Sequence, residues 1–154
     1  MKNQLEKIYW RYLPDFGWSH LLLRIPLACV FIQQGLSKLP LDFAMPSGLG
    51  IPPLVWIFVA YGEILSGIGL LVGGLTSLAI VRNIPILAIM GDILTRFSGI
   101  VMTCVVTGVF WTVLKPQTFA DVDMFHLFLW VGGLYFALRG NWAVASTYKN
   151  QINN

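Results

Sequence analysis

The chain has 154 residues, of which 56% are hydrophobic and 11% are charged, and its mean hydropathy is +0.72. Soluble domains carry about 25% charged residues, so this composition excludes an ordinary soluble fold. The net charge is +3, but the basic residues stand singly beside apolar runs, which excludes a nucleic-acid-binding face. We therefore predict an all-α integral membrane protein in contact with the lipid bilayer.

Four apolar segments approach or exceed the length of about 20 residues that a membrane-spanning helix needs. They predict a four-helix bundle in a single transmembrane domain, residues 1–154, with helices at about 18–39, 53–75, 93–114 and 122–139. The first segment is too long for a signal peptide and no small-residue cleavage site follows it, so we interpret it as a retained helix. Pro53 suits a first helical turn, Pro116 ends the third segment, and Gly140 ends the fourth.

The segment 77–91 allows more than one interpretation. It is apolar but contains Arg82, Asn83 and Pro85, and it is too short to cross the membrane beside the third helix. We interpret it as a helix extension or as a segment lying at the interface. A fifth crossing is disfavoured, because Arg82 would then lie near the middle of the bilayer.

Basic residues predict the orientation of the bundle. Four crossings place both termini on one side, together with Lys2, Lys7, Arg11, Arg24, Arg82, Arg96, Arg139 and Lys149. The other side carries only Lys38 and Lys115. The positive-inside rule therefore predicts a multi-pass protein of the bacterial cytoplasmic (inner) membrane with both termini in the cytoplasm.

Glu63 is the leading candidate for a catalytic residue. It lies about ten residues into the second predicted helix, near the bilayer centre, where a carboxylate costs about 2.5–3.5 kcal/mol. It should therefore be protonated or paired with a cation inside the bundle. Small residues that allow close helix packing accompany it: Gly62, Ser66, Gly67, Gly69, Gly73 and Gly74. Two roles remain open, a carboxylate that exchanges protons and one that only ties helices together.

The first predicted helix has a cation near each end of one face, Arg24 and Lys38. Gln34 precedes Lys38 by four residues, so their side chains are neighbours on a helix. One interpretation is a polar cluster of Gln34, Lys38 and Glu63 within the bundle. The other, which we favour for each cation alone, is that Arg24 and Lys38 snorkel to opposite head-group layers.

Two further polar pairs have helical spacing. Asp92 and Arg96 are four residues apart, which favours a local ion pair over an interfacial binding site. Asp123 precedes His126 by three residues, and we interpret His126 as an ordinary interfacial histidine rather than a haem ligand or proton relay.

No metal site or cofactor-holding motif is predicted. Cys29 and Cys104 lie in apolar runs without CxxC spacing or a neighbouring histidine, and we interpret them as buried structural thiols. There is no serine-centred elbow and no glycine-rich phosphate loop. Whether the chain is an enzyme stays open.

Four stretches resemble the DoxX family of small bacterial membrane proteins in their order and spacing: LLLRIPLACVFIQQGLSKL, VAYGEILSGIGLLVGGLT, GDILTRFSGIVM and FLWVGGLYFALRGNW. The resemblance covers about residues 21–142. This chain has Gln34 where many relatives place a histidine, and it has extra residues around 82–92.

The resemblance implies a four-helix membrane fold, and the positions that it carries over are Arg24, Gly35, Lys38, Glu63 and Arg96. Some members of the family are linked to quinone-coupled sulfur oxidation, as subunits of thiosulfate:quinone oxidoreductase. Others resemble scaffolds for redox or stress enzymes, and related eukaryotic proteins assist membrane-protein assembly. The family therefore implies the fold more firmly than the activity.

Three functions follow as hypotheses. The first is a membrane subunit of a quinone-linked redox system with a partner redox protein. Glu63 would exchange protons, and the ligand-binding candidates are Arg24, Gln34, Lys38 and Arg96. The second is a non-catalytic scaffold or accessory subunit that helps to assemble a membrane complex. The third is a small-solute transporter, which four helices could form only as a homo-oligomer.

Overall fold

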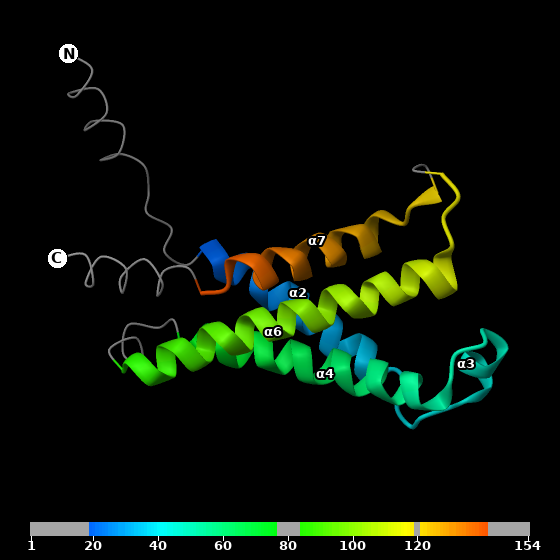
Figure 1. Cartoon of the computed structure of the whole chain (residues 1–154), viewed down its shortest axis with the longest axis horizontal. Coiled ribbons are helices and arrows are strands. Elements are labelled where there is room, and N and C mark those ends of the chain that lie inside the picture. Colours follow the sequence, from blue (N-terminus) through cyan, green and yellow to red (C-terminus); the bar gives the residue numbers. More distant parts are fainter. Residues whose placement is uncertain (1–18, 77–83, 119–120, 142–154) are drawn as a thin grey trace, which may run out of the picture.

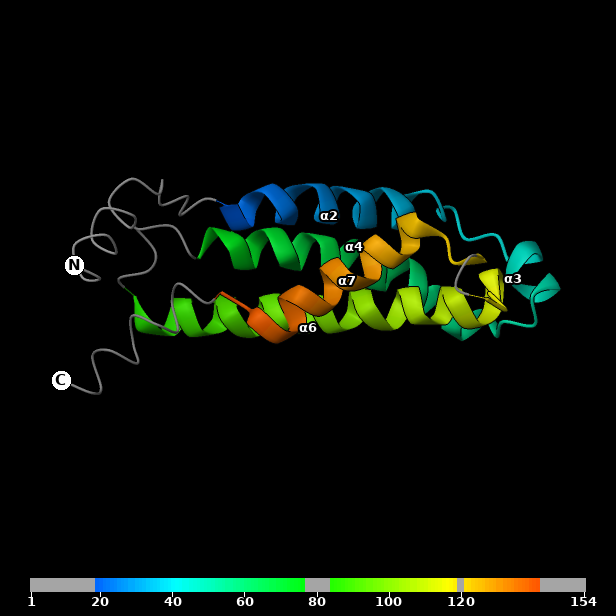
Figure 2. The ribbon, with the colours of Figure 1, turned by 90° about the horizontal axis from the view of Figure 1, so that it is seen from above.

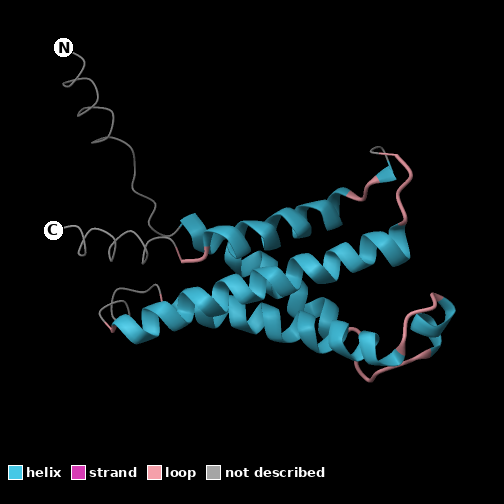
Figure 3. Cartoon of the chain, in the orientation of Figure 1, coloured by secondary structure: helices cyan, strands magenta, loops and turns pink. Residues whose placement is uncertain are grey.

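The computed structural model describes residues 19–76, 84–118 and 121–141, and within these ranges it is helical without any strand (Figure 3). The long helices are α2 (Ser19–Leu36), α4 (Pro53–Leu75), α6 (Pro85–Val109) and α7 (Met124–Arg139). A short π-helix, η1 (Phe110–Leu114), continues α6, and a short helix, α3 (Ala44–Gly48), lies between α2 and α4. The predicted all-α fold with four long helices is confirmed.

The long helices form an elongated bundle in which α2 packs on α4, α4 on α6 and α6 on α7 (Figures 1 and 2). The start of α2 and the end of α7 lie at the same end of the bundle, whereas α3 lies at the opposite end (Figure 1). Toward the α3 end, α4 and α6 separate. The buried core comprises Leu27, Ala28, Phe31, Leu70, Met102, Val106, Leu129 and Phe136.

The ends of α4 coincide with the predicted range 53–75. Helix α2 is shorter than predicted and ends at Leu36, because the backbone N–H groups of Lys38 and Leu39 bond three residues back rather than four. Helix α7 begins at Met124, since the carboxylate of Asp123 accepts a hydrogen bond from the backbone N–H of Phe125 and caps the helix.

The third long helix begins well before the predicted residue 93. Helix α6 starts at Pro85, which needs no hydrogen bond to its nitrogen in a first turn, and Ile84 before it is extended. Residues 85–91 are therefore a helix extension, one of the two interpretations of this segment. Arg82 and the other residues of 77–83 lie outside the described ranges.

The outer surface of the bundle is apolar. Helix α4 and the continuous segment Ile86–Leu114 are long and apolar enough to cross a membrane, and α2 and α7 provide shorter apolar helices. Large side chains that are more than 60% exposed include Leu22, Phe58, Leu65, Phe97 and Leu138. Such a surface suits lipid rather than water. Cys29 and Cys104 also lie exposed, so the prediction that these thiols are buried is wrong.

Glycines allow the close packing of α4 on its neighbours. A Cβ atom at Gly67 would lie 2.6 Å from Cγ1 of Ile32 and 2.8 Å from the carbonyl oxygen of Ala28, both on α2. On another side of α4, Gly69 and Gly73 face side chains of α6. The small residues of α4 therefore face two different helices, which brings polar side chains of those helices within reach of α4.

We predict that Gly67→Ala destabilises the bundle by about 1–3 kcal/mol, because the added methyl group would overlap α2. The matched control is Gly108→Ala in α6, where a Cβ atom meets nothing within 4 Å. The measurement is thermal unfolding in detergent, followed by circular dichroism. Equal melting temperatures of the two variants would contradict the packing described here.

Candidate functional site

Lys38 and Glu63 form an ion pair inside the bundle. The Nζ atom of Lys38 lies 2.5 Å from Oε2 of Glu63, and the two side chains are only 15% and 6% exposed. Nζ also donates to the backbone carbonyl of Gln34 at 3.1 Å, whereas the side chain of Gln34 is exposed. Lys38 therefore points into the bundle, and the prediction that it snorkels to the head groups is wrong.

Close contact between α2 and α4 brings the side chains of Lys38 and Glu63 within reach of each other. A Cβ atom at Gly35 would lie 2.7 Å from the carbonyl oxygen of Ala60, so the two backbones nearly touch just before Lys38. Lys38 follows the end of α2 and reaches across to Glu63 on the next turn of α4. The carboxylate in the apolar bundle is thereby paired, as the sequence required of it.

A small polar cavity adjoins the ion pair. Its volume is about 60 Å³, and its lining is Phe31, Gln34, Lys38, Glu63, Val105, Val106, Val109, His126 and Leu129. We call it the inner cavity. At about 30 Å³ per water molecule it has room for about two waters beside its polar groups.

His126 lines the inner cavity together with Glu63, which the sequence did not indicate. Its Nδ1 atom hydrogen-bonds Oδ2 of Asp123, and the two side chains are 28% and 42% exposed. The spacing of three residues predicted contact between Asp123 and His126. This spacing did not indicate that His126 faces Glu63, because the position of His126 relative to α4 depends on how α7 packs.

The pKa of the Asp123 carboxyl group lies below its usual range. The main cause of this lowered pKa is the hydrogen bond with His126, and a second hydrogen bond, from the backbone N–H of Phe125, lowers the pKa further. Both interactions favour the ionised carboxylate over the protonated form.

A larger apolar pocket lies on the other side of Lys38, between α4 and α6. It has a volume of about 300 Å³ and is lined by Lys38, Ile51, Val55, Trp56, Phe58, Val59, Cys104, Val105, Gly108, Val109, Thr112 and Val113. We call it the lateral pocket. It shares Lys38, Val105 and Val109 with the inner cavity, so Lys38 stands where the two meet.

The ring of Trp56, which lines the lateral pocket, packs beside Lys38. The Nζ atom of Lys38 lies 5.6 Å from the centre of the Trp56 ring, and the indole Nε1 of Trp56 is buried without an acceptor among the described residues. A groove of about 740 Å³ between α4 and α6 shares Phe58 with the lateral pocket and continues along both helices.

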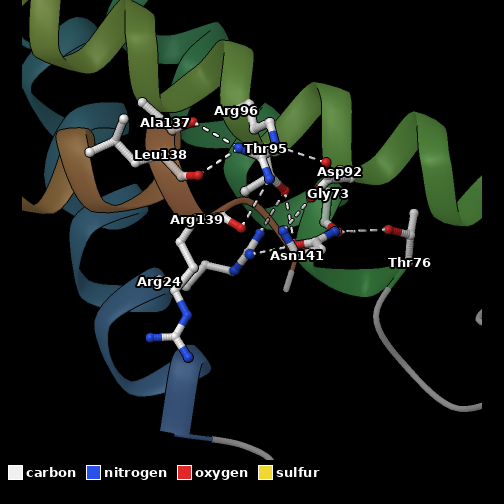
Figure 4. Close-up of polar contacts among 10 residues, drawn as sticks. All are labelled: Arg24, Gly73, Thr76, Asp92, Thr95, Arg96, Ala137, Leu138, Arg139 and Asn141. Atoms are coloured by element: carbon white, nitrogen blue, oxygen red, sulfur yellow. Dashed lines mark hydrogen bonds and ion pairs between the residues drawn. The ribbon is translucent and has the colours of Figure 1, made fainter. Parts of the chain in front are cut away.

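Arg24 lies toward the opposite end of the bundle, about four helical turns from Lys38. One terminal nitrogen donates to the carbonyl of Leu70 at 2.6 Å and to Oγ1 of Thr95 at 3.1 Å. The other donates to Oδ1 of Asn141 at 2.7 Å, and Figure 4 shows Arg24 beside Thr95 and Asn141. The side chain is fully buried, so the prediction that Arg24 snorkels to the head groups is also wrong.

Asn141 ties the end of α7 to α4 and α6. Its Nδ2 atom donates to the carbonyl of Gly73 at 2.7 Å, one of the last carbonyls of α4, which have no partner within the helix. Its backbone N–H donates to Oδ1 of Asp92 at 2.6 Å. The sequence analysis missed Asn141 and Thr95, although a polar residue directly after the helix-ending Gly140 was a signal for the former.

Arg96 pairs with Asp92 at 2.8 Å, as their spacing predicted. Its terminal nitrogens also donate to the carbonyls of Leu138 at 2.6 Å and of Arg139 at 3.3 Å (Figure 4). A cation at the C-terminal end of α7 donates hydrogen bonds to carbonyls that have no partner within the helix. Its positive charge also interacts favourably with the negative end of the helix dipole. We call this network the terminal clamp: Arg24, Gly73, Asp92, Thr95, Arg96 and Asn141.

The predicted site residues therefore fall into two groups. Glu63, Lys38 and Gln34 line the inner cavity, whereas Arg24 and Arg96 belong to the terminal clamp. Among the described residues, no group of three His, Cys, Asp or Glu side chains is placed to hold a metal ion.

The apolar exterior, the four packed helices and the paired charges between them define a small helical membrane protein. The family model of DoxX matches residues 19–90, and this match supports a DoxX family membrane protein, as the resemblance predicted. The match includes Lys38 and Glu63, whereas His126 and Asn141 lie beyond it. Neither the curated proteins nor the solved structures gave a match to this chain.

We predict that Asn141→Ala lowers the free energy of unfolding by about 1–3 kcal/mol, because one terminal nitrogen of the buried Arg24 side chain loses its acceptor. The control is Gln117→Ala at an exposed position. Thermal unfolding in detergent compares the two. A melting temperature of Asn141→Ala equal to that of the control would show that the terminal clamp contributes little.

We predict that Asp123→Asn removes an acid-sensitive contribution to stability. Folding lowers the pKa of Asp123, so its carboxylate stabilises the folded state. This stabilisation is complete above the unfolded-state pKa of about 4 and is lost as the pH falls through the folded-state pKa. Asparagine still caps the helix, so the variant isolates the charge. Melting temperatures of wild type and variant should differ at neutral pH and converge under acid conditions; a difference independent of pH would contradict this.

Proposed function

We propose that this DoxX-like protein is the membrane subunit of a quinone-linked redox system. In this proposal the ring of a lipid-soluble quinone binds in the lateral pocket and exchanges protons through Glu63. The observation that carries the proposal is the position of the Lys38–Glu63 ion pair between an apolar pocket and a polar cavity. A quinone needs this combination, because its ring is apolar and its two oxygens accept hydrogen bonds.

The donor at the lateral pocket matches a quinone oxygen. Lys38 carries three N–H donors, of which the bonds to Glu63 and to the carbonyl of Gln34 use two, so one remains for a ligand carbonyl. Val55, Val59 and Val109 line the same pocket and would contact the ring.

The adjoining groove along α4 and α6 supports a ligand with a long apolar tail. It shares Phe58 with the lateral pocket, and its lining includes Leu65, Phe97 and Val101. A lipid tail would bury apolar surface along this groove. A water-soluble solute would find few polar partners in either hollow, which weighs against the small-solute transporter.

The proposed chemistry assigns complementary tasks to the ion pair. Reduction of a quinone to a quinol consumes two electrons and two protons, and the electrons would come from a partner redox protein. When Glu63 takes up a proton, Lys38 loses its counter-charge and can donate to a quinone oxygen instead. Lys38 would then stabilise negative charge that develops on this oxygen, and Glu63 would deliver its proton there.

The other predicted site residues take supporting tasks in this proposal. Gln34 lines the inner cavity, whereas Arg24 and Arg96 hold the helices together rather than bind the ligand. Arg24, Arg96 and Arg139 lie at the end where α2 begins, and Lys38 and Lys115 lie at the other end. This distribution supports a bacterial inner-membrane orientation with both termini cytoplasmic and the ion pair in the outer half of the membrane.

We expect Lys38→Met to weaken quinone binding by about tenfold or more, since a hydrogen bond from a charged donor contributes about 1.5–3 kcal/mol. The matched control is Lys115→Met, which removes an exposed lysine from the same end of the bundle. Titration of the purified protein in mild detergent with a benzoquinone analogue, followed by tryptophan fluorescence, measures the affinity. Equal affinities of the two variants, or no saturable binding by wild type, would refute the proposed site.

Glu63→Gln separates the redox role from a scaffold role. The variant should retain quinone binding but lower quinone-dependent turnover with the partner by about a hundredfold or more, because glutamine cannot transfer the proton. Unchanged turnover, accompanied by a change only in thermal stability or in co-purification of the partner, would favour the scaffold.

A further inference from the structure

We infer that His126, held by Asp123, carries protons between the aqueous edge of the bundle and Glu63. The inference rests on the proposed proton exchange at Glu63, but it does not require that the ligand be a quinone. It assigns a catalytic task to a residue outside the region matched by the family model and on a different helix from Glu63.

His126 has the position that a relay needs. It lies in the first turn of α7, near the bundle end that carries the loop between η1 and α7. Its side chain is 28% exposed and yet lines the inner cavity with Glu63 and Lys38. One part of the imidazole ring therefore reaches the surface while another part borders the interior.

Asp123 fixes the orientation of the ring. It caps α7 and accepts a hydrogen bond from Nδ1 of His126, which leaves Nε2 as the nitrogen available for exchange with the cavity. An aspartate that holds one histidine nitrogen while the other moves a proton is a general arrangement for acid–base catalysis.

The inner cavity provides the connection. With about 60 Å³ it can hold about two water molecules, and Lys38, Glu63 and His126 supply hydrogen-bond partners for them. The imidazolium gives its Nε2 proton to such a water, which passes a proton to the Glu63 carboxylate. The ring becomes neutral, Glu63 becomes a carboxylic acid, and bulk water then reprotonates the ring. Each step transfers one proton, and no step transfers an electron.

Three charged side chains in the described part of the chain face His126 or the inner cavity that it lines. Asp123 on one side and Glu63 across the cavity are anionic, whereas Lys38 is the opposing cation. Among the described residues, α6 contributes only apolar side chains to this lining, at Val105, Val106 and Val109, and the Phe110 ring packs nearby. Protonation of Glu63 removes one of the two anions and releases Lys38 from its pair.

Proton and ligand would thus approach Lys38 from different directions. The lateral pocket faces the gap between α4 and α6, and the inner cavity extends toward α7. Separate approaches allow a ligand to stay in the bilayer while its protons come from water.

A pH jump on the full-length protein in lipid nanodiscs tests the relay. Infrared spectroscopy follows the carbonyl stretch of protonated Glu63, which is identified by its absence in Glu63→Gln. His126→Ala should slow the protonation of Glu63 by about a hundredfold, and added imidazole should restore it. Val106→Ala, which alters the lining of the same cavity without removing a titrating group, should react as wild type does. Asp123→Asn should slow the reaction and keep the helix cap.

The outcomes are distinct. An unchanged rate in His126→Ala overturns the inference, and so does a slow rate that imidazole does not restore, because packing would then explain it. Absence of a protonated Glu63 band at every pH overturns it as well. Benzoquinone titration of the same samples is read separately: a wild-type protein that binds no quinone but shows the His126-dependent rate refutes the proposed function and supports the relay.

Discussion

The Lys38–Glu63 ion pair constrains the rest of this bundle. A carboxylate among apolar helices is tolerated only if a cation reaches it, and that cation comes from the residues just after α2. The reach is short, so α2 and α4 must approach closely, which Gly35 and Gly67 allow. The pair also separates the lateral pocket from the inner cavity. Packing, polarity and access to the candidate site therefore depend on one contact.

The sequence predicted much of the fold because hydropathy and helix-ending residues act locally. The limits of α4 follow from Pro53 and from its apolar run, and Glu63 was identified by its depth in that run. The start of α6 at Pro85 was missed because Arg82 and Asn83 interrupt the apolar pattern, although the helix begins shortly after this interruption. A local pattern does not show at which residue after such an interruption the next helix begins.

The site was predicted in part, and the errors share a physical cause. A lysine or arginine near a helix end can snorkel outward or bond inward, and only the neighbouring helices decide between them. Arg24 turned inward because Asn141, more than a hundred residues later, supplies an acceptor. His126 reached the inner cavity because of the rotation of α7. Such contacts depend on tertiary packing, which spacing within one helix does not encode.

The unequal lengths of the helices have a consequence for the surrounding bilayer. Helix α7 has 16 residues, or about 24 Å, whereas Ile86–Leu114 has 29 residues, or about 43 Å. A hydrocarbon layer of about 30 Å matches neither length. The bilayer beside α7 must therefore become thinner, or the side chains that flank α7 must extend to the head groups. The longer helix must tilt or extend beyond the hydrocarbon layer. The protein would accordingly deform the membrane asymmetrically and favour thin or compliant lipid regions.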